Sequence, residues 1–283
     1  IEVDAAGTLS VGVAGFFGAS TQITNIVNTL QGRMKATTNA SGTINVASGT
    51  WTNQGPVSVE LGTFSISAPT WSNTNTITQT GATLNHGGSF NLSNLGTFTR
   101  QPATIGSVNL TGTLTMGSLE TLALDGANNG YGTWTLSGGT IVGGTVATTN
   151  GAQLRLAGGT LNGVTIGALS DVVTNSSTGT AVINGLTLNG KITLGSANTA
   201  SQGLEFNGSQ TLGGGGEIVV GGNQGLWLNQ ANTQLTIGQN IRIHGSTGGI
   251  LASNGVTNTT LTNNGIIEVD AAGTLSVGVA GFF

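Results

Sequence analysis

The chain contains no cysteine and only three prolines among its 283 residues. Without cysteine, neither a disulfide-stapled scaffold nor a cysteine-based zinc site can form. Charged residues are also scarce, at 6% of the chain, which is about a quarter of the usual share. Disordered chains usually combine low hydrophobicity with high charge. This chain is instead 37% hydrophobic with a positive mean hydropathy, so we expect it to fold.

The basic residues are few and scattered. Six Lys and Arg residues give a net charge of −4, and only Arg33 and Lys35 are close in sequence. A nucleic acid backbone needs clustered cations, so we expect no nucleic acid partner. No apolar run approaches the roughly 18 residues of a membrane span, so we expect no membrane insertion. The sequence begins at Ile1 without a signal-like segment, and we expect any export signal to lie outside it.

The dominant feature is a verbatim repeat. Residues Ile1–Phe17 recur letter for letter as Ile267–Phe283, at an offset of 266 residues. Core packing alone would not preserve outward residues such as Glu2 and its duplicate Glu268. Tandem duplication explains the repeat, and we interpret residues 1–283 as a single β-solenoid unit of a tandem array. The repeated segment is called the echo below.

A looser periodicity of 18 to 22 residues runs inside the unit. The segment Leu136–Ile141 resembles Leu156–Leu161, and the pattern apolar-x-apolar-Asn recurs at Leu186–Asn189, Leu204–Asn207 and Leu226–Asn229. Each piece is typical of a short strand bounded by Gly or Asn. Such strands are too short for a flat sheet, but coils stacked about 4.8 Å apart give each strand two neighbours. The sequence therefore predicts an all-β fold, a parallel β-helix of roughly a dozen coils.

Alternation along these strands predicts which side chains face the core. Leu204 and Phe206 point inward while Glu205 points outward. Trp51, Trp71 and Trp134 have the inward phase of the alternation. The Asn residues at equivalent corners are expected to stack into a hydrogen-bonded ladder, namely Asn189, Asn207 and Asn229.

One segment has a different period. Between residues 21 and 35 the apolar residues Ile23, Ile26, Val27, Leu30 and Met34 form a helical stripe. This predicts one short α-helix that packs on the solenoid and covers the Phe pair of the echo. A pair of irregular strands is the alternative, because Thr and Asn are poor helix formers.

The segments Asn263–Val277 and Ser41–Thr50 resemble the strand repeats of bacterial autotransporter passengers and filamentous-haemagglutinin-like surface proteins. The resemblance covers most of the chain apart from residues 21–35. It implies a right-handed parallel β-helix, secretion to the bacterial cell surface, and a role in adhesion, matrix or fibre formation.

Candidate catalytic groups are sparse. Glycoside hydrolysis needs two carboxylates facing one bond. Glu2 and Asp4, duplicated as Glu268 and Asp270, lie two residues apart on an outward strand face, about 7 Å from each other. A solvated strand face explains this pair better than a catalytic site. Asp125 and Asp171 each stand alone. We therefore predict that the chain is not an enzyme.

The two histidines, His86 and His244, are not spaced as metal ligands. We interpret both as surface or corner residues, and we predict no metal and no cofactor.

The best candidate for binding is Trp227. If Leu226 and Leu228 face the core, Trp227 faces outward one coil from Glu205, with Arg242 on a neighbouring strand. An outward aromatic ring can stack on a sugar or on a neighbouring filament. A register slip that leaves Trp227 partly covered by a loop is an equal alternative.

Together these features predict a structural extracellular fibre or giant surface protein. Its partners would be neighbouring copies of the same unit, end to end, with the junction at Phe17–Gly18. A glycan-binding or surface-binding adhesin module is the alternative, and a polysaccharide-active enzyme ranks third.

Overall fold

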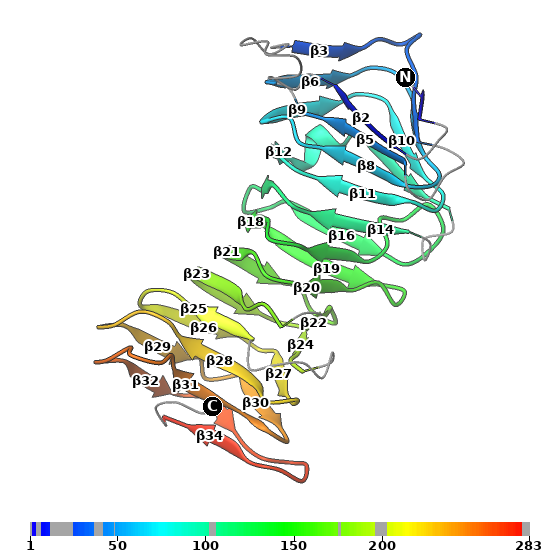
Figure 1. Ribbon diagram of the computed structural model, residues 1–283. Coiled ribbons are helices and arrows are strands. Elements are labelled where there is room, and N and C mark those ends of the chain that lie inside the picture. Colours follow the sequence, from blue (N-terminus) through cyan, green and yellow to red (C-terminus); the bar gives the residue numbers. More distant parts are fainter. Residues whose placement is uncertain are drawn as a thin grey trace. The chain divides into compact units, whose positions relative to one another are not determined.

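The computed structural model describes residues 2–3, 7–11, 25–36, 42–47, 49–101, 106–174, 177–195 and 203–278. They form an all-β parallel β-solenoid of about ten turns (Figure 1). The chain divides into two compact units. Unit 1 comprises residues 1–115, 124–135 and 150–152, and unit 2 comprises residues 116–123, 136–149 and 153–283. The strands β16 (Thr121–Asp125) and β17 (Trp134–Leu136) have residues in both.

Unit 1 has three parallel sheets, and each coil adds one strand to each of them. The β6 sheet contains β3 (Asn25–Asn28), β6 (Thr50–Asn53), β9 (Thr70–Asn73), β12 (Ser89–Asn91) and β15 (Thr113–Thr115). The β7 sheet contains β1 (Glu2–Val3), β4 (Met34–Ala36), β7 (Val57–Val59), β10 (Thr76–Gln79) and β13 (Thr97–Arg100). The β8 sheet contains β2 (Gly7–Val11), β5 (Gly42–Val46), β8 (Thr63–Ile66), β11 (Thr83–His86) and β14 (Ser107–Leu110).

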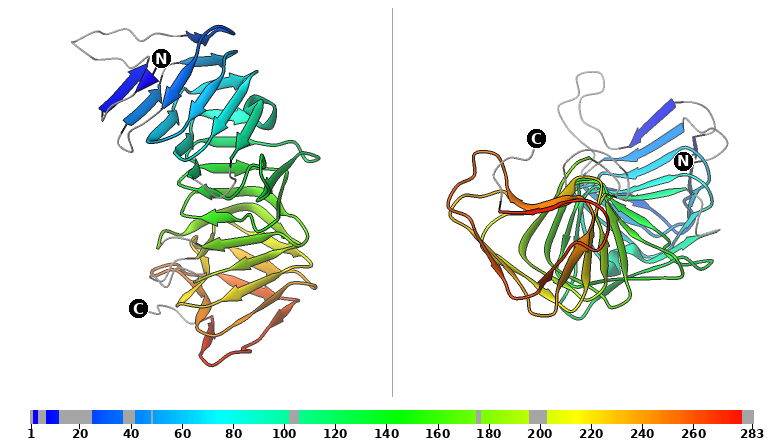
Figure 2. Two further views of the ribbon diagram at one scale, coloured as in Figure 1. Left: turned by 90° about the vertical axis from the view of Figure 1, so that its right-hand side faces the viewer. Right: turned by 90° about the horizontal axis from the view of Figure 1, so that it is seen from below.

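Unit 2 repeats this plan, and in the view from below its coils overlie one another (Figure 2). The β28 sheet contains β18 (Thr140–Val142), the first halves of β21 (Thr160–Ile166) and β23 (Thr180–Leu188), β25 (Leu204–Phe206), β28 (Gln224–Leu228), β31 (Gly248–Ala252) and β34 (Leu275–Val277). The β29 sheet contains β19 (Thr145–Thr149), the second halves of β21 and β23, β26 (Gln210–Gly214), β29 (Gln234–Ile237) and β32 (Thr260–Asn263). The β30 sheet contains β20 (Leu154–Leu156), β22 (Asp171–Thr174), β24 (Lys191–Thr193), β27 (Glu217–Val220), β30 (Arg242–Gly245) and β33 (Ile266–Ile267).

The predicted alternation of inward and outward side chains along the strands is confirmed. In β25 the side chains of Leu204 and Phe206 are buried, while Glu205 between them is half-buried on the outer face. Trp51, Trp71 and Trp134 all lie in the core of unit 1. Each large apolar side chain buried in this way contributes about 1.5 to 3 kcal/mol, so every coil adds a slice of core as well as ladder hydrogen bonds.

The coils are longer than expected toward both ends of the described chain, and at the N-terminal end Gly7 lies opposite Gly42, thirty-five residues later. Thr50 lies opposite Thr70, twenty residues later, but Gln234 lies opposite Thr260, twenty-six residues later. The additional residues are in the loops between strands, where extra length disturbs no ladder. The roughly one dozen coils that we expected therefore become about ten.

The α-helix predicted for residues 21–35 is wrong. Asn25–Asn28 form β3 and Met34–Ala36 form β4, while residues 21–24 lie outside the described part of the chain. Ile26 lies in register opposite Trp51, and the buried Met34 lies opposite Val57. Pairing of this segment with the edges of β6 and β7 outweighs its helix propensity, which is weak because of its Thr and Asn residues. The helical element within the described residues is a single turn of 3-10 helix, η2 (Leu92–Leu95), which is capped by Asn91.

The interpretation of His86 as a surface residue is also wrong. In β11 His86 has the same phase as the buried Leu84, so its ring enters the core and has no exposed surface. It stacks between Trp71 and Trp134, with ring centroids 5.6 and 5.1 Å away. Burial lowers the pKa of His86 to about 3, which keeps the ring neutral.

An asparagine ladder exists, but not at the corners that we predicted. Asn28 donates to Asn53, and Asn53 donates to Asn73, each over 2.6 Å, and all three side chains are buried in the β6 sheet. Among the predicted corners, Asn207 and Asn229 follow paired strands. Asn189 follows Leu188, which pairs with Gly214 in the β29 sheet, so it belongs to a different column.

The echo lies in solenoid strands at both of its positions. The first copy contributes β1 to the β7 sheet and β2 to the β8 sheet. The second copy contributes Ile267 to β33 and Leu275–Val277 to β34. The Phe pairs of the echo and the predicted junction at Phe17–Gly18 lie outside the described residues.

Candidate interaction site

A ladder of alternating charge occupies the outer face of the β30 sheet in unit 2. Register pairing places Asp171 opposite Lys191, Lys191 opposite Glu217, and Glu217 opposite Arg242. Because outward positions of stacked strands lie about 4.8 Å apart, each charge has an opposite charge as its neighbour. Asp171 and Lys191 form an ion pair at 3.5 Å, and Glu217 and Arg242 form one at 3.7 Å.

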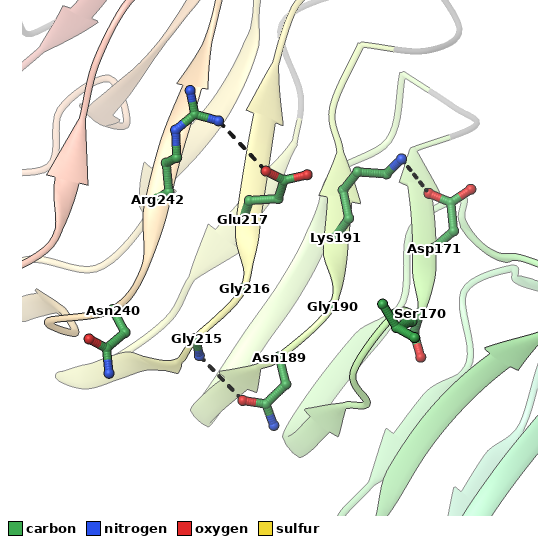
Figure 3. A pocket seen from close by; sticks show the side chains of 11 residues that line it. Ser170, Asp171, Asn189, Gly190, Lys191, Gly215, Gly216, Glu217, Asn240 and Arg242 are labelled. Atoms are coloured by element: carbon green, nitrogen blue, oxygen red, sulfur yellow. Dashed lines mark hydrogen bonds and ion pairs between the residues drawn. The ribbon is translucent and has the colours of Figure 1, made fainter.

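The ladder borders a groove of about 470 Å³ (Figure 3). Figure 3 shows Lys191 extending toward Asp171, and Arg242 extending toward Glu217. The floor is formed by small residues at the corners before the strands, where Gly190 and Gly216 bring successive backbones close together. The groove is lined by Leu169, Ser170, Asp171, Asn189, Gly190, Lys191, Gly215, Gly216, Glu217, Asn240 and Arg242.

Glycine is required at Gly216 because of this close approach. A Cβ atom there would collide with the carbonyl oxygen of Gly190 and with the side chain of Leu188. The backbones of the two successive coils are therefore in direct contact at this corner of the groove.

Arg242 ends the ladder in a cluster that includes the second copy of the echo. Its Nε donates to Glu268 over 2.5 Å, and its terminal nitrogen donates to Asp270 over 3.1 Å. His244 lies 2.7 Å from Asp270 and 3.3 Å from Glu217. The hydrogen bond with His244 and the charge of Arg242 lower the pKa of Asp270, while the hydrogen bond to Glu268 raises the pKa of Arg242.

This cluster corrects the interpretation of His244 as an ordinary surface residue. Only 9% of it is exposed, and it connects two carboxylates. No group of three metal-ligating side chains is found in the described part of the chain. We therefore interpret the cluster as a polar network that joins two coils.

The predicted binding residues do not converge. Glu205 and Trp227 are in-register neighbours on the outer face of the β28 sheet, whereas Arg242 lies in the β30 sheet among carboxylates. Sequence spacing cannot distinguish these faces, because each coil turns through three strands and loop lengths vary.

Trp227 is half-buried, because Leu251 lies opposite it on the next coil. Its indole nitrogen is buried and has no hydrogen-bond partner among the described residues. The cavity beside the ring measures about 50 Å³, which accommodates a water molecule but no sugar ring. The exposed part of the ring and Glu205 remain accessible on the outer face.

The carboxylates of the ladder each face a cation. Lys191 lies in register between Asp171 and Glu217, and each carboxylate forms an ion pair. A glycosidase acid must hold a proton, which an apolar setting favours and a facing cation opposes. The arrangement therefore suits register and polar contact better than proton transfer.

Comparison with family models, with curated proteins and with solved structures finds no match to this chain. Among the described residues, no helix has the length and apolar character needed to cross a membrane.

Proposed function

We propose that the chain is one unit of a structural, extracellular fibre or giant surface protein of a bacterium, in which 266-residue units stack coil on coil. The observation that carries the proposal is the echo. The first copy begins the stacking of unit 1 with β1 and β2, and the second copy ends the stacking of unit 2 with Ile267 of β33 and with β34. A repeat in a linker would have no such strands.

The distribution of exposed apolar side chains supports stacking. Eight large apolar residues are exposed among those described, and five of them lie in the first coil of unit 1 or the last coils of unit 2. These five are Val27, Leu30, Ile266, Val269 and Val277. Exposed apolar residues clustered at a solenoid end favour coverage by another coil, since an open sheet edge recruits further strands.

The resemblance to autotransporter passengers and filamentous-haemagglutinin-like proteins supports an extracellular location and a right-handed helix. A general rule supports the same handedness. Connections between parallel strands of one sheet are right-handed in about 98% of cases. Such a fibre would have a mechanical role. The ladder hydrogen bonds and the apolar core continue along the solenoid axis, and few charged residues interrupt them.

Electron microscopy of the native material tests this proposal. Ten to twelve coils spaced about 4.8 Å apart predict a filament with an axial repeat of about 50 to 60 Å. Discrete monomers in the native material would contradict stacking.

A second candidate is an adhesin module that binds glycans on the outer face of the β28 sheet. The half-buried Trp227 beside Glu205 is the observation that favours it. Glycan-array binding that is lost in Trp227→Ala and retained in Trp227→Phe would support this role. Equal binding by both variants and the wild type would exclude the site.

A further inference from the structure

The two copies of the echo pair with neighbouring coils on opposite sides. In unit 2 its second copy has a neighbour on the preceding coil, where Ile243 lies opposite Ile267. In unit 1 its first copy has a neighbour on the following coil, where Glu2 lies opposite Lys35. Because the two copies are identical, each one displays the neighbour that the other lacks. Together they define both sides of a junction between successive units.

We propose that the echo is a charge-registered joint, in which Glu268 lies between Arg242 of its own unit and Lys35 of the next copy. This inference rests on the proposed stacking of units. The second copy of the echo then serves as the first strands of the following copy. The partner is therefore a second copy of this chain, bound at a defined register.

The charges on both sides support this joint. On the preceding side, Glu217 pairs with Arg242, and Arg242 pairs with Glu268. On the following side, Lys35 lies opposite the first-copy equivalent of Glu268 and forms an ion pair with Glu60 at 3.2 Å. The sequence of signs is negative, positive, negative, positive, negative. The alternation that begins at Asp171 thus continues through the echo without two like charges in succession.

The apolar face of the joint matches as well. Val277 lies opposite the buried Ile250, and it is 45% exposed on the side where the described residues supply no neighbouring strand. Its first-copy equivalent, Val11, lies opposite Val46, which is fully buried. In the joint, Val46 of the next copy would cover Val277 and complete a continuous apolar column.

Both strands of the echo give the same connection between sheets. Through β33 and β1, the β30 sheet of one copy continues as the β7 sheet of the next. Through β34 and β2, the β28 sheet continues as the β8 sheet. Within each copy of the echo the two strands are consecutive along the chain, since β2 follows β1 and β34 follows β33. The charge ladder of the β30 sheet therefore extends, through the diagonal ion pair of Arg242 with Glu268, to Lys35 in β4 and to Glu60, which directly follows β7.

Because the chain contains no cysteine, an introduced pair reports the register directly. In a two-copy chain in which Phe283 is followed by Gly18 and the rest of a second copy, Glu268→Cys is combined with Lys35→Cys of the second copy. Stacked positions about 4.8 Å apart are within disulfide range, so we expect rapid disulfide formation under mild oxidation. Glu268→Cys with Glu60→Cys of the second copy is the matched control and should stay reduced, because its partner is one coil farther away.

The outcomes separate the joint from the stacking itself. Lys35→Cys with Ser58→Cys, an in-register pair within unit 1, should crosslink in a single-copy chain and confirms the fold of the variants. If this pair crosslinks, the two-copy chain forms one continuous rod in micrographs, and the joint pair stays reduced, the joint is wrong while stacking stands. If micrographs show the two copies as separate particles joined by a flexible linker, both the joint and the stacking of units are wrong.

Discussion

At the scale of single residues, His86 makes the stability of the protein depend on pH. Burial lowers its pKa to about 3, from 6.5 in the unfolded chain. Below pH 6.5 the unfolded chain therefore binds a proton that the folded protein does not, so the free energy of unfolding falls as the pH drops from 6.5 toward 3. Between about pH 7 and pH 5 we expect a loss of about 2 kcal/mol, measured by urea denaturation followed by tryptophan fluorescence.

Variants of the two histidines distinguish the contribution of His86 to this pH dependence from the contributions of other titratable groups. His86→Phe keeps a ring between Trp71 and Trp134 and should remove most of the pH dependence in this range. His244→Gln, which changes the second of the two histidines, should leave the contribution of His86 intact. An unchanged dependence in His86→Phe would show that another group is responsible.

The buried asparagine ladder makes a second prediction at this scale. Asn53→Ala removes the acceptor of the Asn28 side-chain amide and the donor to the buried carbonyl of Gly55, while the side-chain oxygen of Asn73 keeps only its hydrogen bond from the backbone of Asn75. A buried polar group without a partner costs about 1 to 3 kcal/mol, so we expect a loss of about 3 kcal/mol in the free energy of unfolding. Asn109→Ala is the control, because the Asn109–Asn85 hydrogen bond is only partly buried. Equal losses in the two variants would contradict a special role for the buried ladder.

At the scale of elements, the corners between strands limit what the coils tolerate. Gly88 has φ of +62°, and a Cβ atom there would overlap the carbonyl oxygen of Ala68 on the neighbouring coil. Gly138 has φ of +76° but open space around it. Gly138→Ala should therefore lose only about 1 kcal/mol from its left-handed backbone, while Gly88→Ala should lose several times as much. Thermal unfolding of the two variants measures the difference, and similar midpoints would mean that coil spacing is not limiting at Gly88.

The charge ladder is an element that we expect to set register more than stability. Glu217→Lys would place three cations in succession with Lys191 and Arg242. Because these side chains are 38 to 44% exposed, the loss should be about 1 kcal/mol or less and should shrink at high salt. Denaturation at low and high salt tests this. Glu205→Lys, in the β28 sheet, is the matched control, and a loss that does not change with salt would argue against a charge effect.

Elements also explain which features the sequence could predict. Alternation placed Leu204, Phe206 and the three core tryptophans correctly, because a period of two depends only on neighbouring residues. His86 shares the phase of Leu84, so the same rule applied to polar residues would have found it in the core. The convergence of Arg242 with Glu217 and Asp270 could not be predicted, because it depends on coil lengths, which vary from 18 residues (Leu154 opposite Val172) to 35 residues (Gly7 opposite Gly42). The segment 25–36 forms two strands, the alternative to the predicted helix, and its apolar spacing did not distinguish between them because it fits a helix as well.

At the scale of the whole molecule, the stacking proposal predicts a specific pattern of amide protection in the echo. The amides of Glu268 and Asp270 already donate to the preceding coil, to Ile243 and Gly245. Because successive residues of a parallel strand direct their amides to opposite neighbours, the amide of Val269 points toward the following coil. In the single-copy chain this amide should exchange with solvent quickly.

In a two-copy chain the next coil would supply the missing acceptor. Hydrogen exchange at Val269 and Val277 should then slow by orders of magnitude, toward the rate of a core strand, because opening would require the joint to separate. The amide of Ile192, within unit 2, should exchange at the same rate in both chains and serves as the internal reference. Exchange at Val269 that remains fast while Ile192 stays protected would mean that the second copy folds without covering the first. The strand order that repeats through each unit would then end at the echo instead of continuing across it.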